Sequence, residues 1–150
     1  MELNTRGRYA VMAMADIAKH GGEGAVPLSG VAERQGLSAA YLEQLFLKLR
    51  RAGLVESQRG RAGGYVLGRD AREIRVSEIM AAVEEETRMT RCLGEGAAGC
   101  LGEERCLTHK LWEALGEEIQ VFLSNVSLQD VLDGIPPRGV RPGAVGVAVA

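Results

Sequence analysis

Three cysteines and one histidine stand close together in the second half of the chain. Their spacing is Cys92-x7-Cys100-x5-Cys106-x2-His109, in a stretch rich in glycine. Glycines allow a chain to turn tightly around a metal. Cys106 and His109 stand three residues apart at the start of a predicted helix, so both side chains can reach one ion. Three thiolates and one imidazole make four ligands, which suits a [2Fe-2S] cluster or a tetrahedral zinc ion.

Other roles for these cysteines stay open at this point. Inert buried cysteines would fit poorly in a polar, glycine-rich stretch. Structural zinc sites usually open with a pair of ligands two to four residues apart, which this stretch lacks. A thiol redox switch would need only one reactive pair. An odd number of cysteines without a visible export signal argues against a disulfide framework. The spacing therefore favours a metal site strongly, and iron–sulfur over zinc modestly.

Charge is unevenly distributed along the chain, although its net value is only −2. Residues 1–80 carry 12 lysines and arginines against 9 aspartates and glutamates, whereas residues 81–150 carry 6 against 11. Between residues 48 and 61, five basic side chains accompany a single acidic one, Glu56. A basic stretch on an acidic protein is a candidate surface for contacting phosphates.

Residues 38–51 have the pattern of a recognition helix. Ser38 is a good N-cap, and an apolar stripe at helical spacing follows it. That stripe consists of Leu42, Leu45, Phe46 and Leu49. A shorter helix is predicted from Pro27 to Gly36, so that residues 36–38 join two helices as in a helix-turn-helix. The face opposite the stripe displays Ala39, Ala40, Glu43, Gln44, Arg50 and Arg51, with Tyr41 and Lys48 near its borders.

A β-hairpin is predicted directly after this helix. Residues 54–58 and 64–67 form its strands, and the turn between them contains Arg59, Gly60 and Arg61. A hairpin in this position is the wing of a winged helix-turn-helix. Glycines at its tip would let the backbone approach a phosphate or the minor groove closely. The helix pair, the basic stretch and the hairpin together favour double-stranded DNA as a partner over a merely solvated surface.

Further helices are predicted around this unit. They are expected over residues 8–19 and 76–83, over 107–125, and after a capping box formed by Ser127 and Asp130. The long helix carries apolar residues alternating three and four apart, which indicates packing against a second copy of the chain. These dimer-interface residues are Trp112, Leu115, Ile119, Phe122 and Val126.

A length of 150 residues suits one domain. We expect a mainly α fold with a small β-hairpin, that is, a winged helix-turn-helix domain plus a long dimerisation helix. Within a domain of residues 1–134, the DNA-binding part is expected over 1–75, the cluster loop over 90–109 and the dimerisation helix over 107–125. Residues 135–150 are expected to form a disordered tail. The sequence shows no secretory signal and no membrane-length apolar run, so we expect a cytoplasmic protein without membrane contact.

Several stretches resemble the IscR family of iron–sulfur cluster regulators, and the resemblance covers about residues 1–134. It rests on Gly7-Arg8-Tyr9-Ala10-Val11, Glu33-Arg34-Gln35-Gly36-Leu37-Ser38, Tyr41-Leu42-Glu43-Gln44-Leu45-Phe46, Gly53-Leu54-Val55, Arg59-Gly60 with Gly63-Gly64-Tyr65, and Cys106-Leu107-Thr108-His109 with Leu111-Trp112. The resemblance implies a homodimeric winged-helix transcription factor, mainly a repressor of cluster-assembly genes, that takes a [2Fe-2S] cluster from cluster-donating assembly machinery. By position, the implied ligands are Cys92, Cys100, Cys106 and His109.

Two features depart from the pattern of that family. The gap between Cys92 and Cys100 is two residues longer than the resemblance implies. Relatives that sense iron or nitric oxide hold a [4Fe-4S] cluster through three cysteines, and some add an aspartate ligand near the N-terminus, where this chain has Arg8. Retention of His109 favours [2Fe-2S] over that alternative. The second departure is Ala40, which replaces a serine often found on the DNA-facing side.

The expected contacts with DNA differ in their chemistry. In the major groove, Gln44 would pair with adenine, and Glu43 would accept a hydrogen bond from cytosine N4 while repelling phosphate. Salt-dependent phosphate or minor-groove affinity would come from Lys48, Arg50, Arg51, Arg59 and Arg61. The expected DNA-binding set is completed by Ser38, Ala39, Tyr41 and Gly60.

Three other classes of protein compete with a DNA-binding regulator. An enzyme is disfavoured, because phosphate-binding-loop and nucleophile-elbow motifs are absent and His109 is better explained as a ligand. A small electron carrier would account for a cluster and leave the helix pair and hairpin unexplained. A zinc-stabilised module would be colourless, which separates it from an iron–sulfur protein. In the favoured interpretation the cluster is a ligand whose occupancy modulates promoter binding.

Overall fold

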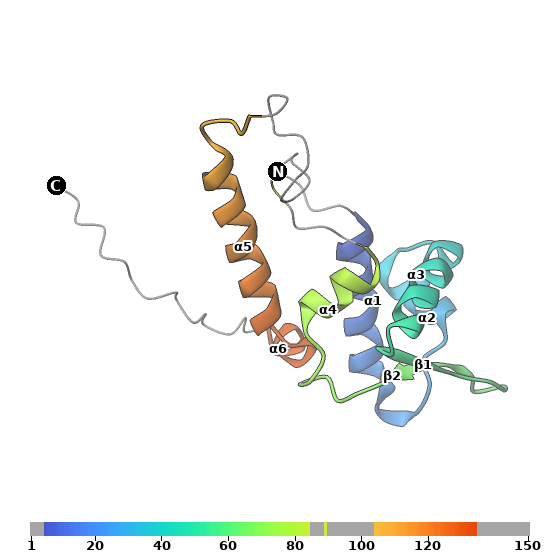
Figure 1. Ribbon diagram of the computed structural model, residues 1–150. Helices are drawn as coiled ribbons and strands as arrows, with labels where there is room; N and C mark the ends of the chain where they lie inside the picture. The colour runs from blue at the N-terminus through green and yellow to red at the C-terminus, as the bar shows by residue number, and fades with distance from the viewer. Residues whose placement is uncertain (1–4, 85–88, 90–103, 135–150) are drawn as a thin grey trace.

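Helices and one β-hairpin make up the described part of the chain, which in this computed structural model comprises residues 5–84, 89 and 104–134 (Figure 1). In chain order the elements are α1 (Thr5–His20), a 3-10 turn (Gly21–Glu23), α2 (Leu28–Gln35), α3 (Ala39–Arg51), β1 (Val55–Gln58), β2 (Gly64–Leu67), α4 (Val76–Ala82), α5 (His109–Asn125) and α6 (Leu128–Asp133). The strands pair antiparallel, with Val55 opposite Leu67 and Gln58 opposite Gly64. The described chain is thus mainly α with a small β-hairpin, as predicted.

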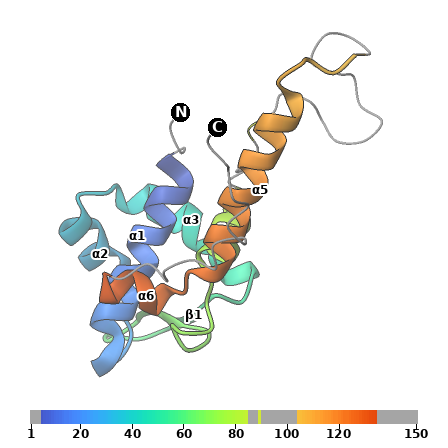
Figure 2. The ribbon, with the colours of Figure 1, turned by 90° about the vertical axis from the view of Figure 1, so that its left-hand side faces the viewer.

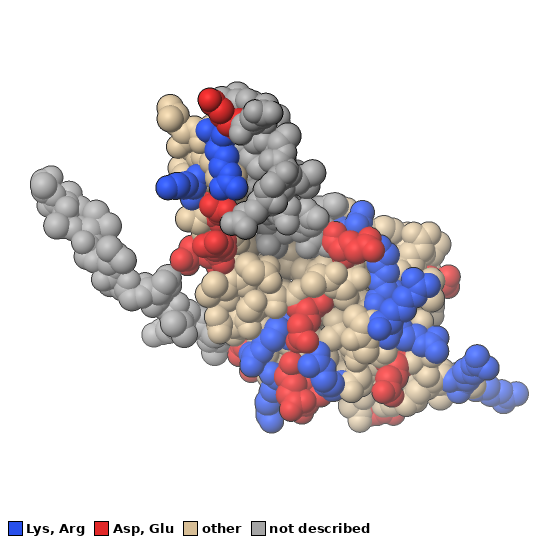
Figure 3. All heavy atoms as spheres, in the orientation of Figure 1, with Lys and Arg blue, Asp and Glu red and all other residues tan. Residues whose placement is uncertain are grey.

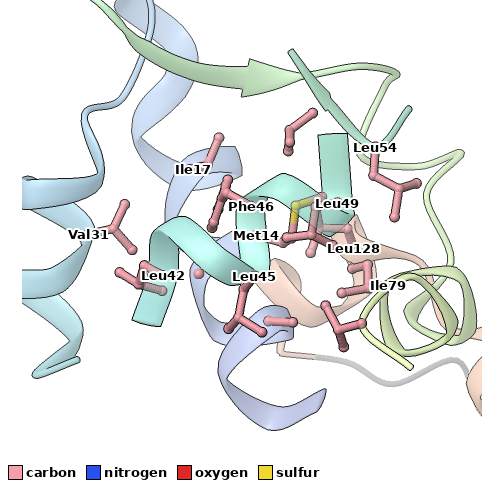
Figure 4. Close-up of a cluster of buried hydrophobic side chains, with 14 of the residues drawn as sticks. Met14, Ile17, Val31, Leu42, Leu45, Phe46, Leu49, Leu54, Ile79 and Leu128 are labelled. Atoms are coloured by element: carbon pink, nitrogen blue, oxygen red, sulfur yellow. The ribbon is translucent and has the colours of Figure 1, made fainter. Parts of the chain in front are cut away.

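The core lies where α1 and α3 face each other, with α4 and α6 closing it. Met14 and Ile17 of α1 and Leu42 and Phe46 of α3 recur at helical spacing on their own helices, so each helix buries one stripe. Figure 4 shows these side chains converging with Leu128 of α6, and all five are buried. This packing leaves the opposite side of α3 toward solvent.

Two predicted helix caps are present. Gly36 ends α2 in a left-handed conformation with φ 64°, which turns the chain toward α3. Ser38 Oγ then accepts a hydrogen bond from the Tyr41 backbone N–H at 3.4 Å. At α6, Asp130 N–H donates to Ser127 Oγ at 3.1 Å, and Ser127 N–H donates to Asp130 Oδ2 at 2.8 Å. Both caps confirm the helix starts that the sequence predicts.

Helix α5 extends away from the body of the protein, which it contacts chiefly through α4 (Figures 1 and 2). It begins at His109 rather than at residue 107, because residues 107 and 108 form a turn. Similarly, α1 begins at Thr5, three residues before the predicted start. Among the helices that the structure describes, none combines the length and apolar character that crossing a membrane requires.

The segment after α5 folds back onto α4. Val126 is buried with Val76 and Met80, and its carbonyl oxygen accepts a hydrogen bond from Val76 N–H at 2.9 Å. The helix ends one residue earlier, and the extended backbone at Val126 takes this side chain off the helical pattern. Val126 therefore packs inside its own chain, which corrects the expectation that it lies on the exposed seam of α5.

A buried ion pair joins α1 to α2. The carboxylate of Asp16, whose side chain is 0% exposed, accepts hydrogen bonds from Arg34 Nη2 at 2.6 Å and Arg34 Nε at 3.1 Å. Gln35 Nε2 donates to the same carboxylate at 2.8 Å. Burial alone would raise the pKa of Asp16. The hydrogen bonds from Arg34 and Gln35, together with the charges of Arg34 and His20, instead hold this pKa below its ordinary value of 3.8.

We therefore expect Asp16→Asn to lower the free energy of unfolding by about 2 kcal/mol at pH 7, because it leaves Arg34 without its carboxylate. A native pKa below the unfolded value means that the carboxylate stabilises the fold above about pH 4–5. This stabilisation is lost as the pH falls through the native pKa. Urea unfolding of both proteins from pH 7 to pH 3 should show the difference shrinking on acidification. A difference independent of pH would contradict this role of the charge.

Candidate nucleic-acid interface and metal ligands

The outer face of α3 is open to solvent because the opposite stripe fills the core. Its exposed residues include Ala39, Ala40, Glu43, Gln44, Arg50 and Arg51, as predicted, and Ser38 caps the helix on the same side. Arg50 and Arg51 form no ion pair with any other residue that the structure describes. Their guanidinium groups are thus available to phosphates.

Two predicted DNA-binding residues at the border of this face are engaged by other parts of the chain. The ring of Tyr41 packs edge-on against Tyr9 of α1, with centroids 6.1 Å apart. Lys48 Nζ donates to Glu84 Oε2 at 2.6 Å, and this hydrogen bond and charge lower the pKa of Glu84. A phosphate would have to compete for Lys48 with this ion pair. The sequence gives no local sign of the pair, because its partners stand 36 residues apart.

The hairpin is fixed to the body at its base and projects at its tip. Tyr65 and Val26 exchange backbone hydrogen bonds of 2.8 and 2.9 Å, and the Tyr65 ring lies 4.9 Å from that of Phe46. At the other end Arg59, Gly60 and Arg61 are exposed. Figure 1 shows the hairpin reaching beyond the helices, and Figure 3 shows basic side chains at that projecting end. The core thus determines the direction in which the arginines point.

The glycines of the hairpin have two different roles. Gly60 adopts φ 119°, and a Cβ there would meet nothing within 4 Å, which agrees with an open tip. A Cβ on Gly63 would instead lie 2.7 Å from Gln58 O, and one on Gly64 would lie 2.3 Å from Val26 O. These two glycines are therefore required by contacts within the chain. Only the tip glycine is free to approach a ligand, which narrows the expectation from the sequence.

One exposed residue of α3 was not among the predicted DNA-binding residues. Leu47 follows Glu43 by four residues and Gln44 by three, so it shares their face, and it is 50% exposed. Helical spacing alone could have identified it, because it falls outside the stripe of Leu42 and Phe46. Its apolar type concealed it in a search for polar and basic contacts.

The described part of the metal-ligand segment brings Cys106 and His109 to the start of α5. His109 N–H donates to the Cys106 carbonyl oxygen at 3.1 Å. The imidazole of His109 is largely buried, with Nε2 3.9 Å from Glu113 Oε1, while Cys106 is half-buried. Cys92 and Cys100, with residues 90–103 of the predicted cluster loop, lie outside the described residues, as does the predicted tail 135–150. Within the described ranges, no group of three or more metal-binding side chains comes together.

Hydrogen bonds order the first turn of α5 around Cys106. Trp112 Nε1 donates to Thr108 Oγ1 at 3.2 Å, and the same oxygen lies 3.6 Å from Cys106 Sγ. Trp112 and Phe122 are 40% and 48% exposed, and Leu115 and Ile119 are half-buried. One helix therefore carries the candidate ligands at its start and an apolar surface along its length.

The arrangement of α2, α3 and the hairpin defines a class of protein. Two short helices meet at a tight turn, the second presents an open polar face, and an arginine-tipped hairpin follows. This is a winged helix-turn-helix, a DNA-binding fold in which the second helix enters the major groove.

The chain belongs to the Rrf2 family, whose model, described as "Iron-dependent Transcriptional regulator", matches residues 3–134. It is 53% identical over 133 residues to the HTH-type transcriptional regulator IscR of Photorhabdus laumondii, which covers 89% of this chain and 80% of that protein. It is 54% identical over 132 residues to the IscR of Xenorhabdus nematophila, covering 88% of this chain and 79% of that one. The resemblance found in the sequence is thereby confirmed.

Solved structures agree with this family. IscR from T. potens superposes with a TM-score of 0.73 at 41% identity, covering 89% of this chain and 88% of that one. CymR, the global cysteine regulator of B. subtilis, superposes with a TM-score of 0.75 at 33% identity, covering 89% and 98% of the two chains. The predicted winged-helix fold is confirmed, and the chain is a DNA-binding transcriptional regulator.

The hairpin geometry leads to a prediction for Gly64→Ala. The added methyl group would overlap Val26 O, so the hydrogen bonds between Val26 and Tyr65 must break or the hairpin must tilt. We expect a loss of about 3 kcal/mol in unfolding free energy, within the range for overpacking. Gly60→Ala serves as the control, since its methyl group meets open space and its cost is backbone strain of about 1–2 kcal/mol. Thermal unfolding compares the two, and equal losses would contradict the proposed role of Gly64.

Proposed function

We propose that this chain is a homodimeric transcription factor of the cytoplasm whose promoter binding is modulated by an iron–sulfur cluster. One observation carries the proposal. The same chain holds an open polar face on α3 beside an arginine-tipped hairpin, and a Cys106–His109 pair at the start of α5. The first feature suits operator DNA, and the second suits iron. The iron-dependent description of the family supports the combination. The cluster is a regulatory ligand, so no enzymatic activity is assigned.

Recognition of DNA is assigned to α3 and the hairpin. The first turns of a recognition helix face base edges, and here they present Glu43 and Gln44. The amide of Gln44 matches the N6 and N7 groups of adenine, and the carboxylate of Glu43 accepts from cytosine N4. Arg59 and Arg61 reach a neighbouring groove or phosphate from the hairpin tip. Phosphate contacts supply most of the affinity, and the two α3 side chains supply the discrimination.

The donor set of the chain fits an iron–sulfur cluster. Thiolates and imidazoles both ligate such clusters, and Cys106 and His109 stand at the correct helical spacing to share one. The burial of His109 agrees with a ligand held away from water. We assign Cys92 and Cys100 as the other two ligands and a [2Fe-2S] cluster as the group, with [4Fe-4S] held by three cysteines as the alternative. Assembly proteins that donate clusters are then partners of this chain.

Helix α5 offers the surface for a second copy of the chain. It contacts its own body chiefly through α4, yet it carries Trp112, Leu115, Ile119 and Phe122 along its length. A projecting helix with exposed aromatic residues gains stability from a partner that covers them. Two copies joined along α5 would present two α3 helices to the half-sites of a two-fold symmetric operator.

A direct contact links α3 to the beginning of the cysteine-bearing segment. Glu84 follows α4 and binds Lys48 of α3, and the carbonyl oxygen of Val83 accepts from Arg6 Nη1 at 3.4 Å. The ligand Cys92 comes eight residues after Glu84. A cluster that binds one conformation of this segment better than another would shift Glu84, and through Lys48 would shift the population of α3 orientations.

The salt dependence of binding tests the assignment of basic residues. On an operator duplex selected with this protein, Arg59→Ala should reduce the slope of log affinity against log salt by about 0.9, the value for one lost phosphate contact. Lys48→Ala should reduce it by less than half as much, because Glu84 already holds that ammonium group. Arg72→Ala, an exposed arginine outside α3 and the hairpin, is the control. Fluorescence anisotropy at several salt concentrations measures the slopes. Equal effects of Arg59→Ala and Lys48→Ala would contradict the assignment.

The cluster is tested on protein purified without oxygen. A visible spectrum and a native mass spectrum should show a brown dimer with one [2Fe-2S] cluster per chain, and His109→Ala should lose the cluster or change its spectrum. The other histidine provides the matched control, since His20→Ala should leave both unchanged. A [4Fe-4S] mass would keep the regulator and favour iron or nitric oxide as its signal. A colourless zinc protein would refute cluster sensing.

A further inference from the structure

Core packing does not explain one large apolar side chain on α3. Leu47 is 50% exposed, although Leu42, Leu45, Phe46 and Leu49 of the same helix are buried. At 100° per residue, Leu47 lies close to the middle of the outer face, opposite the buried stripe. Its neighbours on that face are small, polar or charged. An isolated exposed leucine offers too little apolar surface for a docking protein, but enough for one small apolar group.

We propose that Leu47 is a specificity-determining residue that contacts the C5-methyl group of a thymine in the major groove. This inference rests on the proposed function, in which α3 enters that groove. Thymine alone among the four bases presents a methyl group there, and apolar side chains recognise it. Leu47 has no donor or acceptor on its side chain, so hydrogen-bonding base edges offer it nothing. Burial of its exposed half against a methyl group removes apolar surface from water on both partners.

The position of Leu47 identifies which base pair it reads. Four residues separate it from Glu43, which corresponds to about 6 Å along the helix axis at 1.5 Å per residue. Base pairs along B-DNA are about 3.4 Å apart. The thymine therefore lies one or two steps from the pair that Glu43 contacts. Leu47 extends the reading of α3 by a chemistry that neither Glu43 nor Gln44 possesses.

The surroundings of Leu47 leave room for a base edge. A hollow of about 550 Å³ lies between α3 and the hairpin, with Glu43 and Leu47 on one wall and Leu28 and Gly64 on others. Glu43 is the only charged residue that lines it. In a helix-turn-helix the first helix crosses the DNA backbone, so a hollow beside the first turn of α2 opens toward the duplex. No other charged side chain lining the hollow would have to be desolvated for the methyl contact.

The test replaces each thymine of a selected operator duplex with uracil, one at a time, which removes only the methyl group. For the wild-type protein, uracil at one position per half-site should weaken binding about fourfold, the value for one buried methyl-sized group. For Leu47→Ala, uracil and thymine at that position should bind equally. Leu47→Met, which keeps an apolar side chain, should restore a preference for thymine. Alanine favours helix, so Leu47→Ala should fold, and circular dichroism checks this.

Val121→Ala is the matched control, because Val121 is 48% exposed on α5, outside both α3 and the four-residue seam. It should retain the full thymine preference. The inference is overturned if no thymine shows a methyl effect, or if Leu47→Ala keeps the same effect as the wild type. Failure of α3 as the recognition helix would look different, since Gln44→Ala would then also leave selectivity across operator variants unchanged. A retained effect of Gln44→Ala with no effect of Leu47→Ala refutes only the methyl contact.

Discussion

The packing of α3 against α1 is the contact on which the DNA-binding surface depends. Phe46 and Leu42 are buried against a core that includes Met14 and Ile17, and each large buried side chain contributes roughly 1.5–3 kcal/mol. Rotating α3 by a single residue, about 100°, would remove this stripe from the core and bury Glu43 or Gln44 instead. The outward face of α3 is therefore determined by its inward face, and the polar residues need no contacts of their own to point outward.

The same core also aims the hairpin. Phe46 contacts the ring of Tyr65, whose backbone is bonded to Val26, so strand β2 is attached to both α3 and the chain before α2. Gly64 permits this close approach because any side chain there would overlap Val26 O. The arginines at the tip thus project in a direction set by contacts at the base. Helix and hairpin form one rigid surface, as simultaneous contact with two parts of a duplex requires.

Signals within a few residues were predictable from the sequence, and contacts between distant residues were not. The cap at Ser38, the capping box of Ser127 with Asp130, and the hairpin all follow from local chemistry. Val126 was grouped with the seam of α5 because helical periodicity does not show where a helix ends. The pairing of Lys48 with Glu84 was missed for a different reason: a charge pattern cannot identify a partner brought close only by the folding of α4.

The Lys48–Glu84 pair shows why these distant contacts matter for regulation. One ammonium group cannot fully neutralise both a carboxylate at 2.6 Å and a DNA phosphate, since each would take a share of the same donors. Whatever moves Glu84 therefore changes the charge that α3 offers to DNA, as well as its orientation. Glu84 ends the described part of the chain before the cysteine-bearing segment, and α5 resumes it with Cys106 and His109 just ahead of and at its start. In the proposed regulator, a ligand held by that segment would act on α3 at one end and on the dimer helix at the other, so its occupancy would bias both the affinity of each half-site contact and the spacing between the two.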